Sequence, residues 1–124
     1  MRCLLDTHVL LWWLAGDPLS AEATRAIADP ASELFVSAAS LWEMSIKAGL
    51  GRLEMPEDLA DVLADQSIDV LDVTGRHSFA VRHLPAHHRD PFDRMLVAQA
   101  LTEDLTLISR DESVRRYDAR VLPA

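Results

Sequence analysis

Four acidic residues stand where their carboxylates could act together: Asp6, Glu43, Asp93 and Asp111. Carboxylates that converge without enough basic partners repel one another, and the repulsion raises their pKa values. A hard divalent cation relieves this, because Mg²⁺ or Mn²⁺ takes oxygen ligands and keeps several of its water molecules. Such an ion can bind a phosphate and lower the pKa of an attacking water. The chemistry that these residues could support is therefore phosphodiester hydrolysis.

The segment "RDPFDRMLVAQA", residues 89–100, holds two aspartates with different expected tasks. Pro91 suits the first position of a helix, which makes Asp90 the N-cap residue. On a helical wheel, Asp93 lies at the centre of the apolar arc of that helix. A carboxylate in this orientation is desolvated unless it is paired or bound to metal, and a cap alone has no need of it. We therefore expect Asp93 in an acidic site and Asp90 as a cap that supports it.

Two further acids follow apolar runs of strand length. Asp6 ends the run 2–6, and Asp111 comes two residues after Ser109, where another run ends. If both runs are strands of a parallel sheet, the two carboxylates lie at its carboxyl edge, where open α/β sheets bind ligands. The alternative is that each aspartate only caps a helix, because "DTH" and "RDES" both precede helical sequence.

Glu43 lies in the segment "SAASLWEMSIKAGL", where it borders the inward, apolar face of the expected helix. Ser40 precedes it by three residues, so a capping box is the alternative. A helix that begins earlier, near Ser37, would remove that alternative. Lys47, four residues further on, is placed to form an ion pair with Glu43.

The elements that must position these acids follow from an alternating pattern. Apolar runs of strand length occur at residues 2–6, 33–37, 68–73, 105–109 and 119–123. Helical patterns lie at residues 7–16, 20–29, 38–50, 56–66, 75–84 and 91–104. Strands that alternate with helices predict an α/β fold, a mainly parallel sheet flanked by helices on both faces. No repeat or linker divides the chain, which predicts one domain over residues 1–124.

Composition and charge place few limits on function. Apolar residues make up 49% of the chain and charged residues 26%, as in soluble globular proteins. No apolar run approaches the ~20 residues of a membrane span, and the apolar start lacks the basic region of a signal peptide. Cys3 is the only cysteine, which predicts no internal disulfide and a cytoplasmic location.

The net charge of −8 is unevenly distributed. Residues 1–75 carry 4 basic and 13 acidic side chains, whereas residues 76–124 carry 8 basic and 7 acidic ones. The acidic excess of the first part is typical of a solvated helix face. The charge therefore does not exclude a nucleic-acid partner.

Aromatic residues and histidines each allow more than one interpretation. Trp12 and Trp13 either pack in the core or line a groove for a partner, since exposed aromatic side chains favour interfaces. His83, His87 and His88 suggest zinc at first, but a proline interrupts their spacing and no cysteine accompanies them. They are as consistent with plain surface positions as with phosphate contacts near a site mouth.

Four segments together resemble the PIN-domain ribonucleases of the VapC toxin family: "LLDTHVLLW", "SAASLWEMSIKAGLGRL", "HHRDPFDRMLVAQA" and "LISRDE". The resemblance runs from about Arg2 to Leu122, with the segments in family order. It implies a PIN-like three-layer α/β fold with a mainly parallel five-stranded sheet flanked by helices. It also implies an endoribonuclease that depends on Mg²⁺, with Mn²⁺ as a substitute. The family pattern "DxxxxAxA" matches Asp93, in agreement with the helical wheel.

The resemblance assigns roles to individual residues. The catalytic and metal-binding acids would be Asp6, Glu43, Asp93 and Asp111, which together would hold a metal-activated water. The supporting residues would be Ser109, Thr7 and Asp90, and the candidate RNA contacts Arg89, Arg94 and Arg110. Cleavage is expected to leave a 5′-phosphate and a 3′-hydroxyl.

The resemblance also implies partners. RNA would be the substrate, and a VapB-type antitoxin would insert a segment into the active-site groove, with an arginine that competes for the acidic pocket. A homodimer and a toxin–antitoxin hetero-oligomer are expected, and no membrane partner.

Two other functions compete with this interpretation. A PIN-like module could bind RNA without cutting it, although acids at all four positions argue against that. A phospho-accepting receiver domain has similar length and acidic residues at the sheet edge. It needs a lysine after the last strand, however, and the chain's only lysine is Lys47, in a helix.

Overall fold

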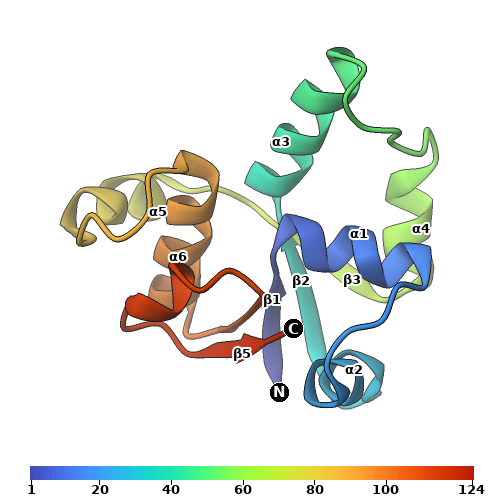
Figure 1. The fold of residues 1–124 in the computed structure, drawn as a ribbon, viewed down its shortest axis with the longest axis horizontal. Coiled ribbons are helices and arrows are strands. Elements are labelled where there is room, and N and C mark those ends of the chain that lie inside the picture. Colours follow the sequence, from blue (N-terminus) through green and yellow to red (C-terminus); the bar gives the residue numbers. More distant parts are fainter.

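A five-stranded parallel sheet forms the centre of the protein, whose computed structural model describes residues 1–124 (Figure 1). The strands run in the order β3-β2-β1-β4-β5, and all four neighbouring pairs are parallel. They are Arg2–Leu5 (β1), Glu33–Ser37 (β2), Ile68–Leu71 (β3), Thr106–Ser109 (β4) and Val121–Pro123 (β5). Each strand lies within its predicted range, and the α/β class is confirmed.

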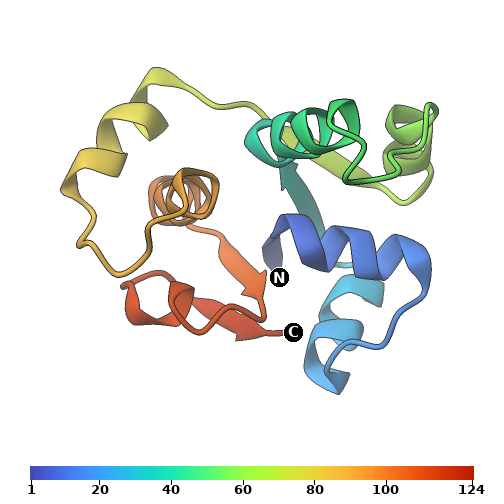
Figure 2. The ribbon, with the colours of Figure 1, turned by 45° about the horizontal axis from the view of Figure 1, so that its top comes forward.

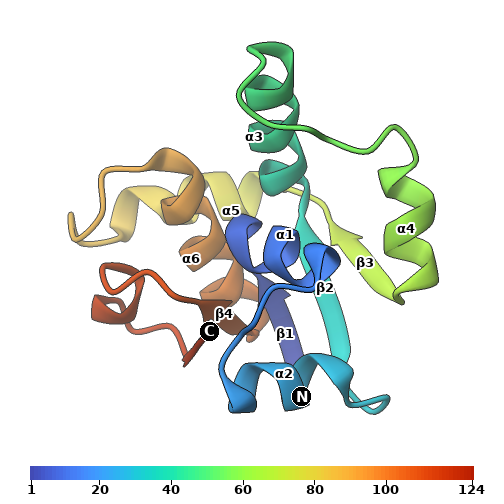
Figure 3. The ribbon, with the colours of Figure 1, turned by 45° about the vertical axis from the view of Figure 1, so that its right-hand side comes forward.

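Six α-helices cover this sheet: Thr7–Ala15 (α1), Ala21–Ala28 (α2), Ala38–Gly49 (α3), Leu59–Asp65 (α4), Gly75–Ala80 (α5) and Pro91–Glu103 (α6). Helices α5 and α6 lie on one side of the sheet, and α1, α2 and α4 lie on the other (Figure 2). Helix α3 continues from the carboxyl end of β2 and rises above the sheet (Figure 3). The sheet is thus the middle of three layers.

The alternation of side chains along β1 divides the core in two. Cys3 and Leu5 face the larger cluster, which includes residues of α1 to α4, whereas Leu4 faces the smaller one. Leu96 and Val97 of α6 fill that second cluster. This is the period-two pattern of a strand buried on both faces.

Polar residues start the three helices that matter most for the site. The side chain of Asp6 accepts a hydrogen bond from Val9 N–H at the start of α1, and Ser37 caps α3. Asp90 caps α6, with Pro91 in the first helical turn, as the sequence predicts. Because Asp6 and Ser37 lie at the ends of β1 and β2, each helix begins where its strand ends.

Two helices differ from their predicted bounds. The predicted helix 75–84 ends at Ala80 and continues as a short 3₁₀ helix, because Leu84 precedes a proline and must adopt an extended backbone. The predicted helix 56–66 begins at Leu59, after a turn.

The strand order also bears on the competing functions. Flavodoxin-like folds such as receiver domains order their strands 2-1-3-4-5. The order here, with β1 at the centre between β2 and β4, is different. The receiver alternative is therefore wrong. No helix is both long and apolar enough to cross a membrane.

Candidate active site

Three aspartates meet at the carboxyl edge of the sheet. Asp6 follows β1 and Asp111 follows β4, and these two strands are neighbours. Asp93 reaches the same edge from the first turn of α6. Ser109 ties the first two together, because its hydroxyl donates to Asp6 Oδ2 at 2.6 Å and accepts from Asp111 N–H at 3.1 Å. The sheet-edge placement expected for Asp6 and Asp111 is thus present in the structure.

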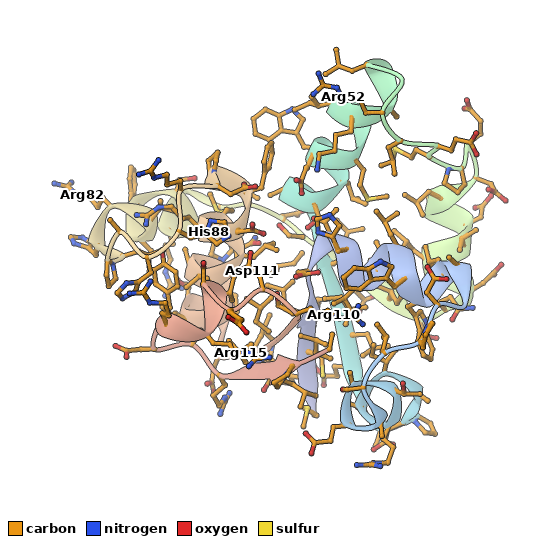
Figure 4. All side chains as sticks on the ribbon, viewed as in Figure 1. Arg52, Arg82, His88, Arg110, Asp111 and Arg115 are labelled. Atoms are coloured by element: carbon orange, nitrogen blue, oxygen red, sulfur yellow. The ribbon has the colours of Figure 1, made fainter.

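His88 lies between two of these carboxylates. Its Nε2 is 2.8 Å from Asp111 Oδ2 and 3.1 Å from Asp93 Oδ2. Its Nδ1 accepts the backbone N–H of Asp90 at 3.0 Å. Figure 4 shows His88 and Asp111 close together, between α6 and the segment that follows β4. His88 Nε2 and one carboxylate oxygen each of Asp93 and Asp111 lie within 4.8 Å of one another, so the three side chains form one cluster.

Burial raises the pKa values of two of the three aspartates, Asp93 and Asp6. Burial and the nearby charge of Asp90 raise the pKa of Asp93 to about 7, and His88 offsets only part of this. Asp6 and Asp111 add further repulsion to Asp93. Burial also raises the pKa of Asp6, against the hydrogen bonds from Ser109 and Val9.

The pKa of Asp111 is shifted in the opposite direction, below its usual value. Burial acts to raise the pKa of its carboxyl, but the hydrogen bond from His88 and those from Ser113 and Val114 outweigh it, so the pKa lies below its usual value. One histidine thus stabilises the charge of Asp111, while Asp93 at its other side is left with a poorly compensated charge.

Glu43 is buried beside this group but is paired separately. Its Oε1 accepts from the Thr7 hydroxyl at 2.8 Å, and its Oε2 contacts Lys47 Nζ at 3.0 Å. The predicted ion pair with Lys47 is confirmed. The capping-box alternative is wrong, because Ser37 rather than Ser40 caps the helix. Thr7 directly follows Asp6, so it links Glu43 to the aspartates through one hydrogen bond.

The three arginines expected to contact RNA are in different situations. Arg94 donates to the carbonyls of Val81, Leu84 and Pro85 and to the Tyr117 hydroxyl, so its guanidinium holds the loop before α6. Arg89 is exposed.

Arg110 packs against α1. Its guanidinium lies 4.1 Å from the centre of the Trp12 ring and donates to the carbonyls of Pro18 and Ala124 (Figure 4). Trp12 and Trp13 pack against the core, as one of the two interpretations has it.

His88 is the residue whose role the sequence does not reveal. The sequence places it near a site mouth or on the surface, and the structure places it between two acids. The only local signal is its position two residues before the N-cap Asp90, where its ring can accept that residue's N–H. Zinc is not favoured by the other histidines, since His83 is exposed and His87 packs on the Tyr117 ring at 5.0 Å.

An apolar hollow of about 540 Å³ adjoins the site. Trp42 and Phe92 line it with their rings 5.3 Å apart, and Ala39, Val73 and Met95 complete much of its wall. Trp42 is 64% exposed, so it belongs to the surface rather than to the core.

Comparison with known proteins agrees with this geometry. The family model described as PIN domain matches residues 3–120. The chain is 30% identical to Ribonuclease VapC22 of Mycobacterium tuberculosis over 118 residues, which cover 92% of this chain and 90% of that protein.

Solved structures with the same fold include toxin–antitoxin complexes. VapBC2 from Rickettsia felis, bound to a promoter DNA fragment, matches with a TM-score of 0.75 and 16% identity, over 99% of this chain and 98% of the other. DNA-bound VapBC from Salmonella typhimurium matches with a TM-score of 0.71 and 19% identity, over 99% of this chain and 98% of the other. FitAcB from Neisseria gonorrhoeae matches with a TM-score of 0.64 and 21% identity, over 97% of this chain and 96% of the other. The chain therefore belongs to the PIN domain family and is similar to its VapC members.

Proposed function

We propose that this protein is a metal-dependent endoribonuclease toxin of the VapC type. The observation that carries the proposal is the meeting of Asp6, Asp93 and Asp111 at the carboxyl edge of the sheet, with a single imidazole between the last two. The similarity to Ribonuclease VapC22 supports RNA as the substrate. Hydrolysis joins a water oxygen to phosphorus and breaks the bond from phosphorus to O3′, so the products carry a 5′-phosphate and a 3′-hydroxyl.

The donor set fits a hard divalent cation. Carboxylate oxygens are the ligands that Mg²⁺ and Mn²⁺ prefer. Burial, and after it the neighbouring acids, raise the pKa of Asp93, and a bound cation would favour its charged form. Asp6, Asp93 and Asp111 would hold the ion, with Glu43 at the flank. A bound Mg²⁺ or Mn²⁺ would offset the phosphate charge and lower the pKa of the attacking water.

The remaining residues act by holding these acids in place. Ser109 fixes the orientation of the Asp6 carboxylate, and Thr7 fixes that of Glu43. Asp90 accepts from Phe92 N–H at 2.8 Å, which starts α6 and so positions Asp93. The exposed Arg89 lies next to His88 in the chain and is available for an RNA phosphate.

We further propose that a VapB-type antitoxin neutralises the toxin and that the protein dimerises. The fold shared with VapBC complexes supports such partners. So do the exposed apolar side chains of Trp42, Val73 and Phe79, which are 64%, 38% and 73% exposed. We place the protein in the cytoplasm, with residues 1–124 as one PIN domain.

The test is RNA cleavage by purified protein with Mg²⁺, with Mn²⁺ and with a chelator. Wild type should cut in either metal and stop when the metal is chelated. Asp93→Asn should not cut, whereas Asp104→Asn should cut like wild type, because Asp104 is 86% exposed and contacts only Arg120. Expression of the same variants in cells, followed by mapping of RNA 5′ ends, would show the target.

The outcomes separate the proposal from its competitor. Wild type that binds RNA but leaves it uncut in both metals would show a binding module without catalysis. Undiminished cleavage by Asp93→Asn would remove Asp93 from the mechanism.

A further inference from the structure

His88 is held in place at three points. Its backbone N–H donates to the Tyr117 hydroxyl at 2.9 Å, and its Nδ1 accepts from Asp90 N–H. Tyr117 is itself buried, and Arg94 donates to the same hydroxyl at 3.1 Å. The third point is the pair of carboxylates at Nε2. These contacts hold the ring between Asp93 and Asp111.

The contacts also define which nitrogen of the ring carries hydrogen. Because Nδ1 accepts a backbone N–H, the ring hydrogen lies on Nε2, from which it bonds to Asp111 Oδ2 at 2.8 Å. Asp93 Oδ2 lies 3.1 Å from the same nitrogen. Nε2 therefore has no lone pair to offer a metal ion. His88 is a hydrogen-bond donor to the acids and not a ligand beside them.

The Nε2–H group occupies a space that a cation could use. Mg²⁺ binds carboxylate oxygens at about 2.1 Å. An ion bound to both Oδ2 atoms on the side of the ring would collide with Nε2, which lies 3.1 Å from Asp93 Oδ2 and 2.8 Å from Asp111 Oδ2. Two-metal nuclease sites place their ions about 3.5–4 Å apart, so a second ion needs such a bridging position. With His88 beside Oδ2 of Asp93, the other oxygen of that carboxylate, Oδ1, remains for an ion.

We propose that His88 is a positioning residue that restricts the site to a single divalent ion, because its Nε2–H fills the space between Asp93 and Asp111 that a second ion would bridge. The inference rests on the proposed function in that it concerns the same metal site. It adds to that function the number of ions and the residue that sets it.

The experiment counts Mn²⁺ ions per chain by calorimetric titration and by electron paramagnetic resonance, which detects two ions that are magnetically coupled. Wild type should bind one ion. His88→Gln should also bind one, since its amide can reach the carboxylates as an N–H donor. His88→Asn, which is one methylene shorter, and His88→Ala should each bind two, with a coupled signal.

His83→Ala is the matched control, because His83 lies in the preceding 3₁₀ helix and is exposed. It should bind one ion. Thermal unfolding checks each variant, and His88→Asn keeps a polar side chain should His88→Ala fail to fold. Two ions in wild type, or one ion in both folded His88→Asn and His88→Ala, would overturn the inference while leaving an RNA-cutting wild type as proposed. A wild type that neither binds Mn²⁺ nor cuts RNA would overturn the proposed function itself.

Discussion

His77 and His88 are two histidines with the same local arrangement and different surroundings. In each, Nδ1 accepts a nearby backbone N–H, from Thr74 for His77 and from Asp90 for His88, at 3.0 Å in both cases. In each, Nε2 then contacts carboxylate oxygen, at 2.8 Å in the shorter case of each. The hydrogen-bond pattern alone therefore does not distinguish a structural histidine from one in a candidate active site.

The difference lies in what the carboxylates have around them. His77 is fully buried and pairs with one acid, Glu103, whose side chain is 35% exposed and solvated. That pair joins α5 to the end of α6 and completes a capping box with Thr74. His88 meets two acids, and further aspartates surround one of them. One solvated acid is stabilised by water and by its hydrogen bond to the histidine, whereas several acids around one histidine carry negative charge that a cation can balance.

Replacing one acidic partner of each histidine should give the largest difference in RNA cleavage. Asp111→Asn should lower RNA cleavage by at least about 100-fold, because it removes a carboxylate proposed to hold the ion. Glu103→Gln should leave cleavage within about twofold of wild type, since no metal chemistry is assigned there. Initial rates of cleavage of one RNA, at equal protein and Mg²⁺ concentrations, measure both. Equal losses in the two variants would contradict the distinction between the histidines.

Replacing the histidines themselves should have the opposite order of effects on stability, with the larger loss at His77. His77→Ala should lower the free energy of unfolding by about 2–3 kcal/mol, because it leaves a cavity where a fully buried side chain packs and removes the hydrogen bonds of the ring to Thr74 N–H and to Glu103. His88→Ala should cost less than about 1 kcal/mol without metal, because its loss leaves partly exposed groups that water can reach. Urea unfolding of the metal-free proteins provides the comparison. A larger loss in the free energy of unfolding for His88→Ala than for His77→Ala would show that His88 is the structural histidine of the two.

The sequence predicts the strands and the acids on regular elements far better than the contacts of His88. The period of the apolar runs predicts every strand, and the wheel separates Asp90 from Asp93, because both depend on regular geometry near the residue. The position of His88 depends on Tyr117, which follows it by 29 residues and has no periodic relation to it. Arg94 shows the same limit. Its charge suggests a phosphate contact, but the carbonyls it binds come from the short 3₁₀ helix after α5 and from the loop that follows it.

The stability of Asp93→Asn tests the charge of the site without catalysis. Burial and neighbouring acids raise the pKa of Asp93 to about 7 in the folded protein, above its ordinary value of 3.8. The folded state therefore favours the protonated carboxyl, and stability falls as the pH rises from the unfolded pKa through the folded one. Asparagine cannot ionise, and its amide oxygen can still accept from His88.

Without metal, Asp93→Asn should be more stable than wild type by about 1–2 kcal/mol near pH 8, a figure reduced because the partly exposed carboxylate is screened by solvent. The gain should shrink as the pH falls from about 7 toward 4, where wild-type Asp93 becomes neutral in both states. Urea unfolding across this pH range measures it, and Glu103→Gln, at the other histidine, serves as the control. Saturating Mg²⁺ should reverse the order, because only the carboxylate binds the ion. A pH-independent difference would show that the charge of Asp93 is already balanced, as that of an acid beside a structural histidine would be.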